Sequence, residues 1–309
     1  MNLSIIITLL NDDAECRATI ASLRATAPPD LPIFVIDDCS EKPFVYDGDE
    51  YVMVVRNRER IGCAPSRHKG AEMVATSHLM FTDSHMRFEP GWYPNLLKKM
   101  AKRPECCWNG TCLGLAEGRM DLAKFQGCYT GATLNLFGID KNRPTFKLIL
   151  ESQWGSYKDD EEIPSFMGAC YTIPKQVYFA CGGLVGLRAW GSDEPYLSAR
   201  LWLSGFEIRQ ALDVRVGHMF RNKASYTTNT WLISWNKVWA ILTLFGDTDP
   251  AMFLLGKLKS VTPEVDWKLC MAELIRQQPE IVAEYDRNKT RFKHDLRWLC
   301  NKFKIAYPE

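Results

Sequence analysis

The sequence has no apolar run long enough to cross a bilayer and no excess of charge of either sign. Its first apolar stretch ends at Leu10, far short of the roughly 20 residues that a membrane-spanning helix needs. The N-terminus also lacks the basic start and the small-residue cleavage site of a signal peptide. The formal net charge of the 309 residues is +1, so no global field marks a nucleic-acid-binding protein, although a local basic patch is compatible with it.

Cysteine is present, but not in the spacings typical of zinc sites or of the disulfide bonds that stabilise small secreted proteins. The 11 cysteines are odd in number and scattered. No CxxC pair is matched by a second one, and the adjacent Cys106 and Cys107 are poor partners for each other. We therefore expect reduced cysteines that serve as small apolar side chains, as is typical of cytoplasmic proteins.

The first part of the sequence alternates β-branched apolar runs with stretches of helical spacing. We predict strands at residues 4–10, 33–36, 51–55 and 78–82, and helices at residues 12–25 and 64–76. This order is typical of parallel strands joined by right-handed crossovers, and ligands of such sheets bind beyond the carboxyl ends of the strands. The polar residues at these ends are Asn11, Asp37, Asp38 and Asp83.

The rest of the sequence is less regular until its last part. We predict strands at residues 165–173, 207–212 and 215–218, and helices at residues 174–181 and 194–203. From Tyr226 the pattern is helical, and Trp231, Trp235 and Trp239 recur on one face that we expect to pack onto the rest of the protein. We predict a catalytic domain at residues 1–222 and a helical C-terminal extension at residues 223–309.

The most informative stretch is the end of the strand predicted at residues 78–82, which Asp83 and His85 follow. Side chains two residues apart point the same way in extended backbone, so this carboxylate and imidazole can share one divalent cation. Such oxygen and nitrogen ligands suit Mn²⁺ or a similar ion, with diphosphate oxygens completing its shell. The alternative is an aspartate that ends a strand and an unrelated histidine.

A second histidine, His218, ends another predicted strand and is followed by Arg221. The histidine is either structural or a further ligand. The guanidinium of Arg221 is a planar, permanent cation that suits a diphosphate, and it could equally form a surface salt bridge.

An aromatic residue and two acids, Trp190, Asp193 and Glu194, follow a glycine-rich segment. A tryptophan here could cover a sugar or a diphosphate, and the carboxylates could bind sugar hydroxyls or act as a base. A structural role is compatible with this one, because Ser192 could cap a helix whose first turn contains both acids.

The segment at residues 55–71 is a basic loop that leads into a predicted helix. The N-terminus of that helix could approach a phosphate, and Arg67 lies within its first turns. On composition alone the segment could also be a solvated face or a nucleic-acid-binding surface.

Together and in this order, the motifs resemble the catalytic domain of the polypeptide N-acetylgalactosaminyltransferases. The likeness rests on the segments 60–71, 83–85, 190–193 and 216–221. Residues 36–40 and 166–170 are, more broadly, similar to family-2-type glycosyltransferases of the GT-A fold. The resemblance covers about residues 3–222, and it implies an α/β, Rossmann-like mixed sheet of the nucleotide-diphospho-sugar transferases, here with a helical C-terminal extension.

The resemblance also implies roles for individual residues around a UDP-sugar donor. Asp83, His85 and His218 match the metal ligands for Mn²⁺ (or Mg²⁺), and Arg221 matches the arginine that binds the diphosphate. The nucleoside and the donor would be held by Thr8, Asp38 and Arg67. The sugar would be lined by Gly168 and Ala169, covered by Trp190 on a mobile loop, and bound through its hydroxyls by Asp193.

One departure from the resembled family bears on stereochemistry. Glu194 stands where the N-acetylgalactosaminyltransferases carry asparagine, and paired acids look more like inverting family-2 enzymes, in which the second carboxylate deprotonates the acceptor. The other motifs resemble the retaining family more closely. We therefore expect retention, and keep an inverting enzyme with Glu194 as its base as the alternative.

The acceptor is open: a glycan, a protein serine or threonine, or a modified DNA base flipped out of its duplex. No anchor, stem or lectin-like module is recognised in the sequence. We expect a cytoplasmic enzyme of a bacterium or a virus. A rival of another class is a nucleic-acid-binding protein that docks residues 56–69 on phosphates, for which no divalent metal would be needed.

Overall fold

The computed structural model describes residues 2–118, 120–139, 147–221 and 227–309. In this part of the chain, nine strands form one mixed sheet. Eight of them run side by side in the order β3 (Val52–Arg56), β2 (Ile33–Asp37), β1 (Leu3–Leu9), β4 (His78–Asp83), β10 (Cys170–Pro174), β6 (Cys107–Ala116), β11 (Ile208–Phe220) and β5 (Met86–Phe88). The ninth, β7 (Gly127–Thr130), pairs with β6.

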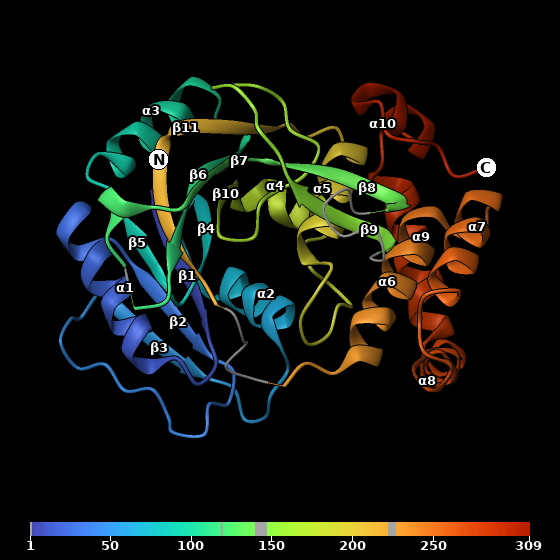
Figure 1. Cartoon of the computed structure of the whole chain (residues 1–309), viewed down its shortest axis with the longest axis horizontal. Helices are drawn as coiled ribbons and strands as arrows, with labels where there is room; N and C mark the ends of the chain where they lie inside the picture. Colours follow the sequence, from blue (N-terminus) through green and yellow to red (C-terminus); the bar gives the residue numbers. More distant parts are fainter. Residues whose placement is uncertain (1, 119, 140–146, 222–226) are drawn as a thin grey trace.

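The first four strands of this order are parallel, and the rest is mixed (Figure 1). Strand β10 runs antiparallel to both β4 and β6, while β11 runs parallel to β6. A separate hairpin is formed by β8 (Ala132–Ile139) and β9 (Lys147–Trp154). The predicted combination of a parallel half and a mixed sheet is therefore present.

Strand β1 shows why the sheet is covered on both faces. Its residues are almost all buried, as expected of a near-continuous apolar run in a parallel sheet. Ile5 and Ile7 face the core under α1 (Asp13–Thr26) and α3 (Trp92–Lys102). Ile6 faces the opposite core, under α2 (Cys63–Met73) and α5 (Asp193–Leu203).

The C-terminal part consists of helices that continue the second core. These are α6 (Thr230–Phe245), α7 (Asp249–Lys259), α8 (Glu264–Arg276), α9 (Gln278–Arg291) and α10 (Leu296–Phe303). Figure 1 shows them gathered at one end of the sheet, beside the β8–β9 hairpin. Trp235 and Trp239 are buried in the same cluster as α5 and β10, and Trp231 lies at its edge, so the expected apolar face packs as predicted.

The observed elements differ from the predicted ones in several places, and α3 and the strands β5 to β9 were not predicted at all. The strands predicted at residues 207–212 and 215–218 are one strand, β11, whose pairing with β6 is irregular between Gln210 and Arg215. The strand predicted at residues 165–173 begins only at Cys170, and the helix at residues 174–181 is α4 (Lys175–Ala180). The predicted boundary at residue 222 and Tyr226 lie outside the described residues.

None of the helices in the described ranges is both long enough and apolar enough to cross a membrane.

Candidate active site

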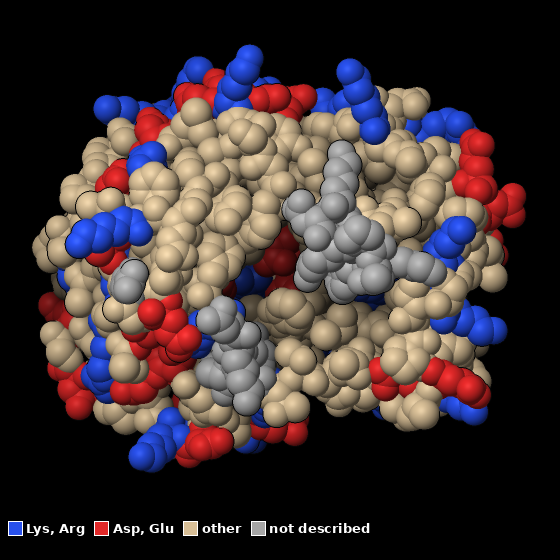
Figure 2. All heavy atoms as spheres, viewed as in Figure 1, with Lys and Arg blue, Asp and Glu red and all other residues tan. Residues whose placement is uncertain are grey.

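A cavity of about 310 Å³ lies at the carboxyl ends of β1, β2 and β4. Figure 2 shows a hollow near the middle of this face of the molecule, with acidic and basic atoms at its bottom. The cavity collects most of the residues predicted from the sequence: Thr8, Asp38, Arg67, Asp83, His85, Gly168, Ala169, Trp190, Glu194, His218 and Arg221. Asp193 is buried directly behind it, within an ion-pair distance of Arg67.

Three of these residues could hold a metal ion. One ligand atom from each of Asp83, His85 and His218 lies within 4.8 Å of the others. The first two come from the end of β4, and His218 joins them because β11 pairs with β5, which directly follows His85. Nε2 of His218 lies 3.3 Å from Oδ2 of Asp83.

The chemistry of this trio fits a divalent cation. Burial alone would raise the pKa of Asp83, but the hydrogen bond from His218 and the charge of Arg67 lower it to about 2, so the carboxylate is ionised. Nδ1 of His218 is buried and has no hydrogen-bond partner among the described residues. One carboxylate and two imidazoles are a donor set that Mn²⁺ and similar ions accept.

A residue that sequence reasoning missed, Asp12, lies behind the trio. Its Oδ2 accepts a hydrogen bond from Ser84 Oγ at 2.7 Å and lies 3.0 Å from Nδ1 of His85. Its other oxygen, Oδ1, forms an ion pair with Arg221. A carboxylate bonded to one ring nitrogen orients the imidazole so that the other nitrogen faces a cation. Burial would raise the pKa of Asp12, but its bonds to His85, Arg221 and Ser84 lower it overall.

Arg67 is the centre of a buried acidic cluster. Its Nη2 donates to Asp83 at 3.0 Å, and its Nη1 donates to Asp193 at 3.0 Å and to Glu194 at 2.8 Å. It also donates to the carbonyl of Gly168 at 3.2 Å. The side chain is almost fully buried, as is expected of an arginine that is paired on several sides. Arg67 therefore joins the predicted metal ligand Asp83 to the two predicted acids.

Glu194 has an unusual environment. Burial first, and then the nearby Asp193, raise the pKa of Glu194 to about 7, against the opposing effect of Arg67. A Cβ at position 168 would lie 2.8 Å from Oε1 of Glu194, so glycine is what lets this carboxylate lie against the backbone. Ser192 does stand at the N-terminus of α5 as predicted, but its side chain caps no amide.

Asp38, predicted to contact the nucleoside, organises a loop at the opposite end of the cavity. Its carboxylate accepts hydrogen bonds from the amides of Ile61 and Gly62 at 2.9 and 2.7 Å, and from Nδ2 of Asn57 at 2.9 Å. Gly62 has a φ of 103°, and a Cβ there would collide with the backbone of Ala189. The loop at residues 57–62 is therefore packed directly against the segment that contains Trp190.

An aromatic cluster, formed by Tyr129, Trp154 and Phe220, lies at the rim of the cavity near His218. Trp154 lines the cavity and is 43% exposed, and Phe220 is 38% exposed. The ring centroids of Tyr129 and Trp154 lie 4.9 Å apart, and those of His218 and Phe220 lie 4.6 Å apart. Sequence reasoning missed the cluster because its members come from β7, β9 and β11, and no local pattern connects them.

The sequence of this chain is similar to those of known glycosyltransferases. The glycosyl transferase family 2 model matches residues 4–114. Over 260 residues the chain is 28% identical to polypeptide N-acetylgalactosaminyltransferase 3 of Taeniopygia guttata, covering 76% of this chain and 41% of that protein. It is 27% identical over 232 residues to polypeptide N-acetylgalactosaminyltransferase 8 of Drosophila melanogaster, covering 72% of this chain and 38% of the relative. The chain thus spans less than half the length of these relatives.

Two solved structures share the fold. A crystal structure of GalNAc-T7 with UDP, GalNAc and Mn²⁺ superposes with a TM-score of 0.70 at 16% identity, over 98% of this chain and 56% of that one. TarS of S. aureus, residues 1–349 in complex with UDP-GlcNAc, has a TM-score of 0.52 at 13% identity, over 99% of this chain and 93% of that one. The predicted GT-A fold is confirmed. The chain therefore has the GT-A fold, and it is similar to family 2 glycosyltransferases over residues 4–114 and to polypeptide N-acetylgalactosaminyltransferases over most of its length.

Proposed function

We propose that the chain transfers a sugar from a UDP-sugar donor, and that Asp83, His85 and His218 hold the Mn²⁺ (or Mg²⁺) that the reaction needs. The observation that supports this most directly is the gathering of these three ligands in one cavity at the carboxyl ends of the parallel strands. The solved relatives GalNAc-T7 and TarS were crystallised with UDP and Mn²⁺ and with UDP-GlcNAc, respectively.

The residues around the trio have distinct tasks in this proposal. A bound cation would supply positive charge to the departing diphosphate, the main electrostatic requirement of the reaction. Arg221 would add a second charge from the side, in an orientation that its ion pair with Asp12 sets. At the other end of the cavity, Thr8 and Asp38 would bind the nucleoside, with Asp38 also shaping its loop. Arg67 would act on the donor indirectly, by holding the acids in place.

The sugar would lie between these two ends. Gly168 and Ala169 line the cavity there, and Trp190 would cover it. Asp193 is buried and forms an ion pair with Arg67. We therefore propose that Asp193 supports the hydroxyl contacts of the sugar indirectly, by holding Arg67 and the start of α5 in place.

We propose a retaining outcome, because the metal and arginine motifs resemble the retaining family and because Glu194 is bound by Arg67 at 2.8 Å. One observation favours the inverting alternative. Glu194 lines the cavity, and a pKa near 7 is the value that suits a general base at neutral pH.

We propose that the acceptor approaches over the aromatic cluster of Tyr129, Trp154 and Phe220. Two of its members, Trp154 and Phe220, are exposed and can stack on a sugar ring, a nucleobase or an apolar side chain. A glycan, a protein serine or threonine and a modified DNA base all meet this condition. We place the reaction in the cytoplasm, since the 11 cysteines, all unpaired in the structure, suit a reducing compartment.

Calorimetry tests the central proposal. UDP should bind the wild-type protein tightly only with Mn²⁺, and Asp83→Ala or His218→Ala should abolish that dependence while the fold stays intact. Asp13→Asn is the matched control, because Asp13 is an exposed acid next to the site that pairs only with Arg17 in the described structure. Unchanged metal-dependent affinity in the Asp83 and His218 variants would refute the ligand assignment.

A further inference from the structure

The segment between α4 and α5, residues 181–192, holds an unusual backbone conformation. Gly182, Gly183, Gly186 and Gly191 have positive φ angles, as glycines tolerate. Ala189 and Ser192 also lie in the left-handed region, at φ values of 50° and 67°, where residues with a side chain are disfavoured. Such a conformation persists only when the surroundings enforce it.

Asn236 of α6 supplies that enforcement at the tip of the segment. Its Oδ1 accepts a hydrogen bond from the amide of Arg188 at 2.8 Å. Its Nδ2 donates to the carbonyl of Arg188 at 2.6 Å and to the carbonyl of Gly191 at 2.8 Å. One fully buried amide thus binds the backbone on both sides of the dipeptide Ala189-Trp190.

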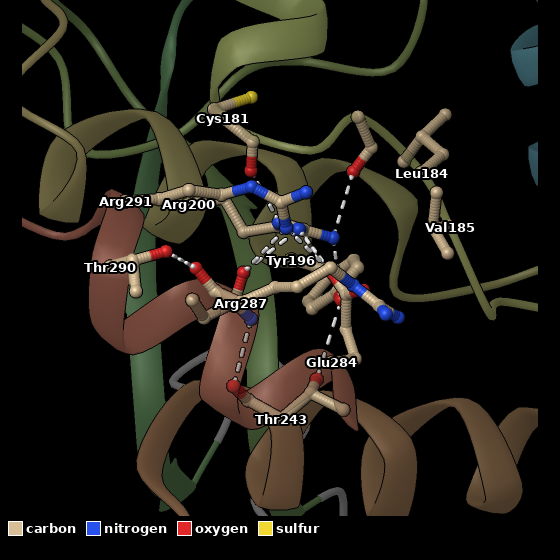
Figure 3. A network of polar contacts seen from close by, with 12 residues as sticks. Cys181, Leu184, Val185, Tyr196, Arg200, Thr243, Glu284, Arg287, Thr290 and Arg291 are labelled. Atoms are coloured by element: carbon tan, nitrogen blue, oxygen red, sulfur yellow. Dashed lines mark hydrogen bonds and ion pairs between the residues drawn. The ribbon is translucent and has the colours of Figure 1, made fainter. Parts of the chain in front are cut away.

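The base of the segment is held by other residues. Nε of Arg200 donates to the carbonyl of Cys181 at 2.7 Å, and Figure 3 shows this side chain lying between the segment and Glu284 of α9. Nε1 of Trp239 donates to the carbonyl of Val185 at 3.1 Å. Because these contacts do not involve Asn236, its loss would remove three hydrogen bonds from the tip while the base stays attached. The tip would keep the hydrogen bond from the amide of Ala189 to the carbonyl of Ile61 at 3.1 Å and the ion pair of Arg188 with Glu273 at 2.6 Å.

The position of the tip matters because Trp190 borders two cavities. Its side chain is 48% exposed, and it lines both the proposed donor cavity and a neighbouring cavity of about 530 Å³ beside the N-terminus of α6. We propose that Asn236 is a positioning residue, which locks the strained tip so that Trp190 covers the donor cavity. That Trp190 covers a donor rests on the proposed function. The lock, by which we mean the three hydrogen bonds from Asn236 to the tip, does not depend on it.

Trypsin tests the lock without any ligand, because Arg188 lies within the tip. In Asn236→Ala, cleavage after Arg188, followed by mass spectrometry, should be on the order of tenfold faster or more than in the wild type, since three hydrogen bonds no longer oppose local opening. Ser234→Ala is the matched control. Ser234 is on the same helix and bonds weakly to Thr262 at 3.4 Å, so its cleavage rate should match the wild type.

A second variant and a second measurement separate the outcomes. Asn236→Ser keeps one donor and should give intermediate cleavage after Arg188, with a melting temperature near that of the wild type. Unchanged cleavage in a folded variant would overturn the proposal. So would cleavage throughout α6 to α9 with a collapsed melting temperature in both variants, since Asn236 would then only support the core.

Donor binding then distinguishes the lock from the function. With UDP and Mn²⁺, the wild type should be protected at Arg188, and Asn236→Ala should bind UDP more weakly, with a raised donor KM. Faster cleavage of the variant together with no UDP binding by any form would uphold the lock and refute the proposed function. Faster cleavage with unchanged donor KM would refute the link between Asn236 and the placement of Trp190.

Discussion

Replacing Glu194 with glutamine removes a carboxyl group whose ionisation the fold opposes. Burial and the neighbouring Asp193 raise its pKa from 4.5 to about 7. Between these two pH values the folded protein retains a proton that the unfolded chain has lost, so the free energy of unfolding falls as pH rises through this window. At about 1.4 kcal/mol per pKa unit, the fall amounts to roughly 3 kcal/mol, and it is complete above pH 7.

Urea unfolding at a series of pH values measures this effect. We expect the unfolding free energy of Glu194→Gln to decrease less than that of the wild type between pH 4.5 and 7, by up to roughly 3 kcal/mol. The exposed Glu264→Gln is the control and should follow the wild-type curve. If the unfolding free energies of the wild type and Glu194→Gln changed equally with pH, the raised pKa of Glu194 would be refuted.

The same variant separates the two stereochemical outcomes. If Glu194 is the base of an inverting reaction, its amide should reduce the transfer rate on the order of 10²–10⁴-fold. Under retention, the outcome we propose, the loss should be far smaller and donor binding should persist. The anomeric configuration of the product, read from NMR coupling constants, decides independently: a β-linked product from an α-linked donor would mean that the alternative is correct.

Three further predictions concern the groups around the site. Asp12→Asn should weaken Mn²⁺ binding by about 10–100-fold, because His85 loses the carboxylate that orients it; calorimetry that finds wild-type affinity would contradict this. Arg221→Lys keeps the charge but loses the planar fork, so transfer should fall in a folded protein, and wild-type turnover would leave Arg221 as a salt-bridge residue. Deleting every residue after Arg221 should expose the partners of Trp235 and Trp239 and give insoluble protein; a soluble, active truncation would show that the remaining core suffices.

The parallel half of the fold was predictable because its signals are local. Apolar runs such as β1 and β4 end at polar residues within the printed sequence, and the sheet rules place those ends together. The pairing of β11 with β5 was not predictable in this way. It joins residues more than a hundred positions apart, and it is what brings His218 to Asp83 and His85. Only the family resemblance, and not the spacing, predicted that His218 belongs with them.

Arg67 shows a different limit of sequence reasoning. Within residues 55–71 it is one of several cations, and the composition there is typical of a solvated face. The structure instead buries Arg67 against three carboxylates, from β4 and from the start of α5. Nothing in the local pattern distinguishes it from its exposed neighbours, because its burial depends on how α2 and α5 pack across the second core.

Helix α6 lies between these two cases. The spacing of its tryptophans predicted a packed face, and Trp235 and Trp239 are buried there. The same helix contains Asn236 and Lys237, polar residues within an otherwise apolar stretch, and both are buried. A buried amide or ammonium must find partners, since leaving it unsatisfied is costly. Lys237 pairs with Glu151 of β9, and Asn236 binds the backbone around Trp190. Polar residues inside an apolar helix therefore predict that tertiary contacts exist. Which segments of the chain supply those contacts cannot be predicted from the sequence of the helix, because the fold determines it.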